Sequence, residues 1–244
     1  MAETKISTGS YDLNKILFGG YEKDIITTIY GPGGSGKTNL CILVTASQAK
    51  KQNKIIYMDT EGGFSIDRMK QLFENSEEEL DSLLKNIHLL KPTSFEEQEA
   101  DFGKLLKYVK SGNISLIIID SIAMLYRLEL GDAIKSKDGE KIQEVNRKLA
   151  RQLRTLTEIS RKQNIPIIVT NQVYSEFVQD SNEKEEKRVS MVGGDLLKYW
   201  SKCIIEVQNS HSRRKLILRK HRSLPELELE FEITNSGIKK RGFF

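Results

Sequence analysis

Residues 31–38 read GPGGSGKT, and this run restricts the possible folds more than any other part of the chain. The pattern Gly-x-x-x-x-Gly-Lys-Thr is that of a P-loop, in which a glycine-rich turn points successive backbone N–H groups at phosphate oxygens. The turn leads into a helix, whose positive end also attracts anions. The flanks agree, because IITTIY at 25–30 is a strand pattern and LCILVTASQAK at 40–50 suits a helix. This context favours a P-loop over a glycine-rich turn that merely contains a lysine.

The residues of this loop have separate expected roles. We expect Lys37 to reach the β and γ phosphates of a nucleoside triphosphate, and the Thr38 hydroxyl to ligate Mg²⁺. The residues expected to contact the nucleotide are Gly31, Pro32, Gly33, Gly34, Ser35, Gly36, Lys37, Thr38 and Asn39. The sequence therefore predicts a Mg²⁺-dependent nucleotide site at the start of a helix.

Apolar runs between helical patterns predict an α/β fold. The runs lie at 25–30, 54–59, 115–120 and 165–170, and each is mostly apolar, as in a parallel strand that is covered on both faces. From about Lys202 onward the pattern changes to short runs separated by turn residues, which predicts antiparallel strands at the C-terminal end. We expect a mostly parallel central sheet that is flanked by helices and extended by these antiparallel strands.

Helix signals fill the intervals between these strands. Apolar residues spaced by three and four from Ile142 to Ile159 predict one long helix before the last parallel strand. Capping-box spacing predicts helix starts at Ser76 and Ser94, each followed three residues later by a glutamate.

Length and composition set further limits. The chain has 244 residues and lacks a Gly/Pro-rich linker, so we expect one domain over residues 1–244. No apolar run of about 18 residues and no signal-like N-terminus is present, which predicts a cytoplasmic protein without a membrane partner. Cys41 and Cys203 are expected in the core, because their spacing does not suit a metal site. The net charge of +4 is too mild to identify a nucleic-acid binder unless the charge is clustered.

Three polar residues follow predicted strands, where ligands bind in open α/β sheets. Asp120 ends the run LIIID, and we expect it to hold the Mg²⁺ shell opposite Thr38 rather than to cap a turn with Ser121. Glu61 follows the strand at 54–59 and is our candidate to orient or deprotonate the attacking water, although an acid at the mouth of a turn is also common there. Gln172 follows the strand at 165–170 and is placed to sense the γ phosphate, although a turn residue is the simpler interpretation.

These residues carry a resemblance to a known family. The segments STGSYDLNKILFGGYEKDIITTIYGPGGSGKT, MDTEGGFSIDR, LIIIDSIAMLYR, IPIIVTNQV and SLPELELEFEIT, in this order, resemble the RecA-family recombinases, most closely the archaeal RadA and RadB group. The resemblance spans nearly the whole chain and implies a RecA-like P-loop NTPase core with ATP and Mg²⁺ as cofactors. It also implies catalytic roles for Lys37, Glu61 and Gln172, metal binding by Thr38 and Asp120, and stacking of Arg68 on adenine.

The chain departs from a strand-exchange enzyme at three places. Only about thirty residues precede the P-loop, so we expect no separate N-terminal DNA-binding domain, as in the short RadB paralogues. The segment 174–194, which binds single-stranded DNA in RecA-like enzymes, has five acids against three bases. The segment 126–141, expected as a loop, is likewise diluted by acids. Neither segment suits the cationic neutralisation that nucleic-acid binding needs.

Positive charge is concentrated later, in HSRRKLILRKHR at 211–222, which contains no acid. The residues predicted to bind DNA are Arg213, Arg214, Arg219, Lys220, His221 and Arg222. An exposed hairpin face is an equal alternative, because Lys and Arg also protect sheet edges. By resemblance, Lys220 or Arg222 is a candidate for a cation that acts on a neighbouring subunit's nucleotide.

The resemblance to RadB implies ATP binding with weak hydrolysis, and DNA binding, single-stranded or branched, without strand exchange. It also implies a regulatory part in homologous recombination and repair, with a Holliday-junction resolvase or a RadA-type recombinase as partner and a homo-oligomer as an open question. Two alternatives remain: an active DNA-dependent ATPase recombinase, and a nucleotide-gated protein adaptor that binds an acidic partner through the basic hairpin.

Overall fold

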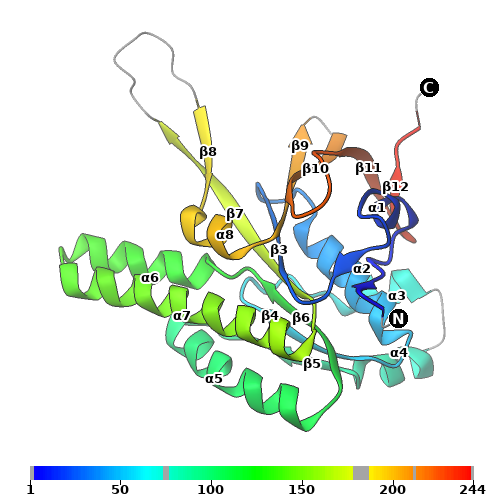
Figure 1. Ribbon diagram of the computed structural model, residues 1–244, viewed down its shortest axis with the longest axis horizontal. Helices are drawn as coiled ribbons and strands as arrows, with labels where there is room; N and C mark the ends of the chain where they lie inside the picture. The colour runs from blue at the N-terminus through cyan, green and yellow to red at the C-terminus, as the bar shows by residue number, and fades with distance from the viewer. Residues whose placement is uncertain (1–2, 74–76, 178–186, 211–212, 243–244) are drawn as a thin grey trace.

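A central sheet with helices on both faces organises the molecule (Figure 1). The computed structural model describes residues 3–73, 77–177, 187–210 and 213–242. In these residues the main sheet has ten strands, nine of them in the order β12-β11-β10-β9-β3-β7-β6-β4-β5, with β8 paired to β7. A separate two-stranded sheet joins β1 and β2. The P-loop strand β3 thus lies inside the sheet, between β9 and β7.

The strands have the following bounds: β1 Lys5–Ile6, β2 Tyr21–Glu22, β3 Ile26–Gly31, β4 Lys54–Asp59, β5 Ile87–Leu90, β6 Ile114–Asp120, β7 Ile167–Phe177, β8 Lys187–Met191, β9 Cys203–Ser210, β10 Arg213–His221, β11 Glu228–Thr234 and β12 Gly237–Lys240. Strands β5, β4, β6, β7, β3 and β9 are mutually parallel, and β10, β11 and β12 continue the sheet in antiparallel pairs. Strand β8 forms an antiparallel pair with the outer half of β7.

The helices have the following bounds: α1 Tyr11–Ile16, α2 Lys37–Ala49, α3 Ile66–Phe73, α4 Glu77–Leu84, α5 Phe95–Ser111, α6 Met124–Lys135, α7 Gly139–Gln163 and α8 Gly194–Trp200. Helices α1 to α4 bury their apolar residues against one face of the sheet, in a core that includes Leu13, Leu40 and Met69. Helices α5 to α8 cover the other face, in a core that includes Phe102, Leu153 and Leu197. The chain therefore has the three-layer α/β architecture expected from its alternating apolar runs.

Most of the predicted elements are confirmed. The four parallel strands are present, and α7 extends from Gly139 to Gln163 with Val145, Leu149, Leu153, Leu156 and Ile159 buried, as the apolar spacing indicated. Ser94 caps α5 by accepting a hydrogen bond from the N–H of Glu97 at 3.1 Å. The Glu97 carboxylate accepts hydrogen bonds from the N–H and the hydroxyl of Thr93. Those bonds lower the Glu97 pKa, and the backbone N–H of Ser94 also helps to lower it, as in a capping box. Ser76 lies outside the described residues.

Three details differ from the sequence prediction. Strand β9 pairs with β3 in parallel, so the antiparallel part begins one strand later, at β10. The segment expected as a loop at 126–141 is largely helical, since α6 covers Met124–Lys135. Strand β7 continues to Phe177, so Gln172 lies inside a strand and pairs with Gly31 rather than following the strand end. Sequence periodicity missed this extension because the polar residues Asn171 and Gln172 interrupt the apolar run before the half of β7 that pairs with β8.

A search of the helices in the described part of the chain finds none that is both long enough and apolar enough to cross a membrane.

Candidate functional site

The P-loop joins the C-terminal end of β3 to the first turn of α2. Gly34 and Gly36 have φ values of 70° and 112°, a left-handed conformation that favours glycine. Gly31 has a different reason to be glycine, because a Cβ there would stand 2.1 Å from the Val207 carbonyl oxygen of β9. The loop therefore leads directly into α2, which begins at Lys37.

Lys37 is almost fully buried, with 6% of its surface exposed. Its Nζ donates hydrogen bonds to the carbonyl oxygens of Gly31 and Pro32, both at 2.9 Å. Burial lowers the pKa of the Lys37 ammonium, and the nearby carboxylates of Glu61 and Asp120 oppose that shift. The ammonium is held inside the loop, within the field of both acids, in the position from which a P-loop lysine can reach phosphate.

Asp120 lies at the C-terminal end of β6, 2% exposed, beside the start of α2. Its carboxylate accepts hydrogen bonds from the Tyr57 hydroxyl at 2.8 Å and from the Thr170 hydroxyl at 2.5 Å. Burial raises the pKa of Asp120, while hydrogen bonds from Thr170, Tyr57 and Thr38 act in the opposite direction. The expected proximity of Asp120 and Thr38 is thus present, because the parallel strands β3 and β6, which lead to these two residues, end at the same edge of the sheet.

Glu61 and Gln172 come together at this edge from different strands. The Gln172 Nε2 donates to the Glu61 Oε1 at 2.9 Å, although the two residues are 111 positions apart in the sequence. Asp59 fixes the loop that carries Glu61, because its carboxylate accepts from the N–H groups of Gly63 and Phe64, each at 3.0 Å. The same loop lies against the P-loop helix, since a Cβ on Gly63 would stand 3.2 Å from Thr38 Cγ2.

The residues of the loop fit a bound triphosphate with Mg²⁺. The Ser35 hydroxyl is fully buried and has no hydrogen-bond partner among the described residues, so it is an unsatisfied group that phosphate or water can satisfy. Thr38 and Asp120 supply one hydroxyl and one carboxylate, and Mg²⁺ commonly takes its remaining ligands from phosphate and water. Groups of three metal-ligating side chains are not found in the described residues.

Sequence reasoning missed the residues that brace this site. Tyr57, Asp59 and Thr170 are internal or terminal strand residues that hold Asp120 and the Glu61 loop. The available signal was their position, because polar residues at the ends of neighbouring parallel strands meet at one edge of the sheet. The identity of their partners depends on strand order, which the sequence did not give.

Arg68 lies near the turn that joins β11 to β12. Its guanidinium donates to the Thr234 carbonyl at 2.8 Å, to the Asn235 carbonyl at 3.4 Å and to Gln71 at 2.8 Å. Burial lowers the pKa of Arg68, and its Nε is buried with no hydrogen-bond partner in the described chain. Stacking of Arg68 on adenine stays a prediction, and the structure adds that the C-terminal hairpin orients the guanidinium.

The basic segment of β10 does not form one surface, because alternate residues of a strand point to opposite faces. Arg214 lies beside the P-loop, since a Cβ on Gly36 would stand 3.9 Å from Arg214 Cδ. Arg213 is exposed, whereas Arg219 on the same side of the strand pairs with Glu206 at 2.6 Å and with Glu226 at 3.1 Å. Those pairs raise the pKa of the Arg219 guanidinium.

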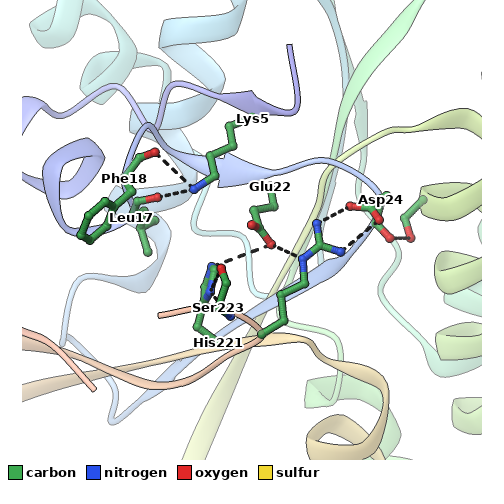
Figure 2. A network of polar contacts seen from close by, with 9 residues as sticks. Lys5, Leu17, Phe18, Glu22, Asp24, His221 and Ser223 are labelled. Carbon is green, nitrogen blue, oxygen red and sulfur yellow. Dashed lines mark hydrogen bonds and ion pairs between the residues drawn. The ribbon is translucent and has the colours of Figure 1, made fainter. Parts of the chain in front are cut away.

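The end of β10 is joined to the N-terminal segment by a polar network (Figure 2). Arg222 pairs with Glu22 at 2.8 Å and with Asp24 at 2.9 Å, and Glu22 also faces His221 at 3.8 Å. Burial lowers the pKa of His221, whose side chain is 2% exposed, and Glu22 opposes that shift.

Lys220, which directly precedes His221, donates to the Lys198 carbonyl at 2.7 Å, so its ammonium faces α8. A DNA-binding role for the six predicted residues remains a prediction. The ion pairs nevertheless reduce the free positive charge that the sequence suggested.

A cleft of about 360 Å³ lies between α6 and β7, next to Gln172. Its lining includes Ser121 and Asn171, each with a buried side-chain oxygen that has no hydrogen-bond partner within the described chain, and the cations Arg127 and Lys135. Lys135 is near Asp132 at 3.6 Å, and Lys141 of α7 pairs with Glu129 of α6 at 3.0 Å. Of the acids expected in the segment 174–194, Asp180, Glu183, Glu185 and Glu186 lie outside the described residues.

Comparison with known proteins agrees with this geometry. The Rad51 family model matches residues 2–241 of the chain. The chain is 38% identical to the DNA repair and recombination protein RadB of Methanosphaera stadtmanae, with 98% of this chain and 97% of that protein covered. It is 42% identical to RadB of Methanococcus maripaludis, with 93% of this chain and 96% of that protein covered. A crystal structure of the RadB recombinase superimposes with a TM-score of 0.76 at 34% identity, and covers 97% of this chain and 99% of that one.

Proposed function

The chain belongs to the Rad51 family and, within it, to the RadB group, and on that premise we propose that it is an ATP-binding and DNA-binding protein of DNA repair and recombination. We further propose a regulatory rather than a strand-exchanging role, with weak Mg²⁺-dependent ATP hydrolysis. The support comes from the P-loop geometry for the nucleotide and from the charge distribution for the DNA.

The proposed nucleotide site uses the residues at the carboxyl edge of the sheet. The P-loop N–H groups and Lys37 bind the triphosphate, because Lys37 is already held within the loop. Thr38 and Asp120 hold Mg²⁺, which when bound neutralises charge on the phosphates. Glu61 orients or deprotonates the attacking water from a loop that Asp59 fixes next to Thr38.

The hydrogen bond between Gln172 and Glu61 is the single observation that carries this proposal. The bond joins Glu61, the residue proposed to act on the attacking water, to β7, whose residues Asn171 and Gln172 also line the cleft beside α6. When the γ phosphate is lost, Gln172 loses one of its proposed hydrogen-bond partners. Because Gln172 lies in β7, the resulting shift of its side chain affects the part of β7 that pairs with β8. Nucleotide state and the surface at β7 and β8 are therefore coupled in this proposal.

The two segments that correspond to the DNA-binding loops of recombinases, 174–194 and 126–141, have few cations free to bind DNA. The segment 174–194 has a net acidic composition, and Lys135 and Lys141 of the cleft region have acidic partners. Affinity for nucleic acid depends on cations that are free to neutralise phosphates. This distribution favours DNA binding without strand exchange, with Arg213 and Lys220 of β10 as contacts for single-stranded or branched DNA.

Two further roles belong to the same proposal. Lys220 and Arg222 are candidates for a cation that faces the nucleotide of a neighbouring subunit, in a homo-oligomer formed with ATP. A Holliday-junction resolvase or a RadA-type recombinase is the proposed protein partner, through which the nucleotide state would affect the cleavage of branched DNA.

Measurement of ATP turnover with and without single-stranded DNA tests the proposal. We expect slow turnover that DNA changes little, together with DNA retention that falls steeply as salt rises. Strong stimulation by single-stranded DNA, with filaments on it, would instead support an active recombinase. Retention of an acidic protein partner without any DNA retention would support the nucleotide-gated adaptor, and loss of nucleotide binding altogether would remove the proposal.

A further inference from the structure

The surface that α7 and α8 form has no role in the site described above. Helix α8 lies against α7 on the helical layer that covers one face of the sheet, on the opposite side from the P-loop helix α2 (Figure 1). Two hollows meet there on either side of Trp200, with volumes of about 580 Å³ and about 480 Å³. Together they form what we call the α7–α8 groove.

Cations follow this groove along α7. The first hollow is lined by Arg147, Arg151 and Arg154, and the second by Arg161 of α7 and Lys202 beyond α8. The spacing of these arginines places them on one face of the helix. Between Arg147 and Arg161 the helix rises about 21 Å, so the row of cations is as long as roughly six stacked nucleotides of one strand.

The acids around the groove already have partners. Glu144 pairs with Lys148 at 3.3 Å, Glu158 with Lys162 at 2.5 Å, and Asp24 with Arg222 at 2.9 Å. Glu99 of α5 forms an ion pair with Arg151 at 3.0 Å. In the described chain Arg147, Arg161 and Lys202 form no ion pair, whereas Arg154 lies close enough to Glu158 to help Lys162 lower the pKa of that carboxyl. Arg147 donates a hydrogen bond to Gln143 at 2.9 Å. The groove still has an excess of positive charge, because cations outnumber acids in its lining.

Aromatic rings lie at the centre of this charge. Tyr199 is 71% exposed, and its ring meets that of Trp200 edge to face with centroids 5.3 Å apart. Trp200 is partly buried against the core below, which fixes its ring in place. Ala150 lines the first hollow next to Trp200, and its small side chain leaves space beside the indole. An exposed tyrosine and a partly buried tryptophan among several arginines match the needs of single-stranded nucleic acid, namely stacking surfaces and cations for the backbone.

We propose that the α7–α8 groove binds single-stranded nucleic acid, with a base stacked on Trp200 and the neighbouring phosphates paired with Arg147, Arg154 and Arg161. The inference rests on the proposed DNA-binding function and adds a contact surface separate from β10. An acidic protein segment would match the charge but not the stacking position, so the nucleic acid is the occupant to which the groove is assigned.

The chain offers a direct probe, because Trp200 is its one tryptophan. Stacking of a thymine base on the indole should quench tryptophan fluorescence. The full chain is titrated with oligodeoxythymidylate of roughly twelve nucleotides, about twice the length of the groove. Total binding is followed separately, by the fluorescence anisotropy of a label on the oligonucleotide.

The double variant Arg147→Glu with Arg154→Glu leaves the probe in place. We expect it to weaken the quenching transition at least tenfold and to reduce its salt slope by about 1.4, since each lost phosphate contact on a single strand accounts for about 0.7. The matched control, Lys107→Glu with Lys110→Glu on α5, makes the same charge change at exposed lysines and should leave quenching unchanged. The thermal unfolding of both variants is compared with that of the wild type.

The outcomes separate this inference from the proposed function. An anisotropy increase without quenching, or quenching that the groove variant and the control weaken equally, would overturn the groove assignment while DNA binding stands. Equal quenching by polyglutamate would also overturn it, in favour of an acidic protein segment. If no DNA raises the anisotropy, the proposed DNA-binding function fails first and the groove assignment fails with it.

Discussion

The carboxyl edge of the parallel strands and the basic segment of β10 both contain clusters of polar or charged residues. At the edge, residues far apart in the sequence meet in space, whereas in β10 residues adjacent in the sequence are separated in space. At the edge, Glu61 and Gln172 are 111 positions apart in sequence and share a hydrogen bond of 2.9 Å. In β10, Arg213 and Arg214 are neighbours in sequence, yet one is exposed and the other lies beside Gly36 of the P-loop. Parallel strands bring distant residues to one place, whereas strand alternation separates adjacent ones.

The two regions also differ in how charge is balanced. Lys37 and Asp120 are buried, with the exposed Glu61 in their electrostatic field, and burial shifts the pKa of Lys37 downward and that of Asp120 upward. Arg219 pairs with Glu206 of β9, and Arg222 pairs with Asp24 in the turn before β3, both near the surface. The comparison indicates that a run of like charge in the sequence is a weak sign of a binding surface until the acids of neighbouring strands are known. Four experiments test it.

Substitution of Lys37 should have the largest effect. Lys37→Ala removes the ammonium that the P-loop carbonyls hold, so we expect ATP affinity or turnover to fall by about 100-fold or more, as for other preorganised charges at a reacting centre. Calorimetry with ATP and a turnover assay measure this. Lys104→Ala, an exposed lysine of α5 that pairs with Asp101, is the control. Wild-type affinity and turnover in Lys37→Ala would contradict the assignment of the site.

Substitution of Glu61 should separate binding from chemistry. Glu61→Gln keeps an oxygen for Gln172 but loses the base, so we expect nucleotide affinity to remain while kcat falls by about 100-fold. Single-turnover hydrolysis beside equilibrium binding gives both values. If Glu61→Gln turns over ATP at the wild-type rate, Glu61 has no part in the mechanism and the carboxyl edge loses its proposed water-activating group.

A matched pair on β10 tests the basic segment. Arg213→Ala should reduce DNA affinity several-fold, because Arg213 is exposed, whereas Arg219→Ala should reduce it less, because its guanidinium is already paired with Glu206 and Glu226. Conversely, Arg219→Ala should reduce the free energy of unfolding by about 1 kcal/mol or less. Salt-dependent DNA retention and chemical denaturation measure these effects. The reverse ranking in DNA affinity would mean that the ion pairs open on DNA.

The smallest effect concerns pH. Burial lowers the pKa of His221 below its usual 6.5, with Lys5 and Arg222 acting in the same direction and Glu22 against them. The unfolded chain therefore binds this proton more tightly, so His221 favours unfolding as the pH falls below about 6.5. His221→Asn, which keeps an acceptor near the Ser223 N–H, should flatten the pH dependence of the unfolding midpoint between about pH 6.5 and 5. An unchanged profile would show that His221 titrates as in the unfolded chain.

Much of the site was predictable because its signals are local. The P-loop, the strand at Lys54–Asp59 and the strand that ends at Asp120 were expected at these positions. The resemblance to the RadA and RadB group is confirmed by the family match and the RadB relatives. The partners of Asp120, namely Tyr57 and Thr170, were not predictable, because they depend on which strands are neighbours. The helix at Met124–Lys135 was missed because its pattern of acids and bases resembles that of a solvated loop.

The amino-acid order by itself determined the phosphate-binding turn, the succession of strands and helices, and the family, because each depends on residue type and spacing over short segments. Tertiary structure alone decided that Gln172 lies within a strand bonded to Glu61, that Arg214 lies against the P-loop, and that Arg219 and Arg222 have acidic partners. The physical reason is that charge balance and hydrogen bonding depend on distances across the sheet, and strand order sets those distances.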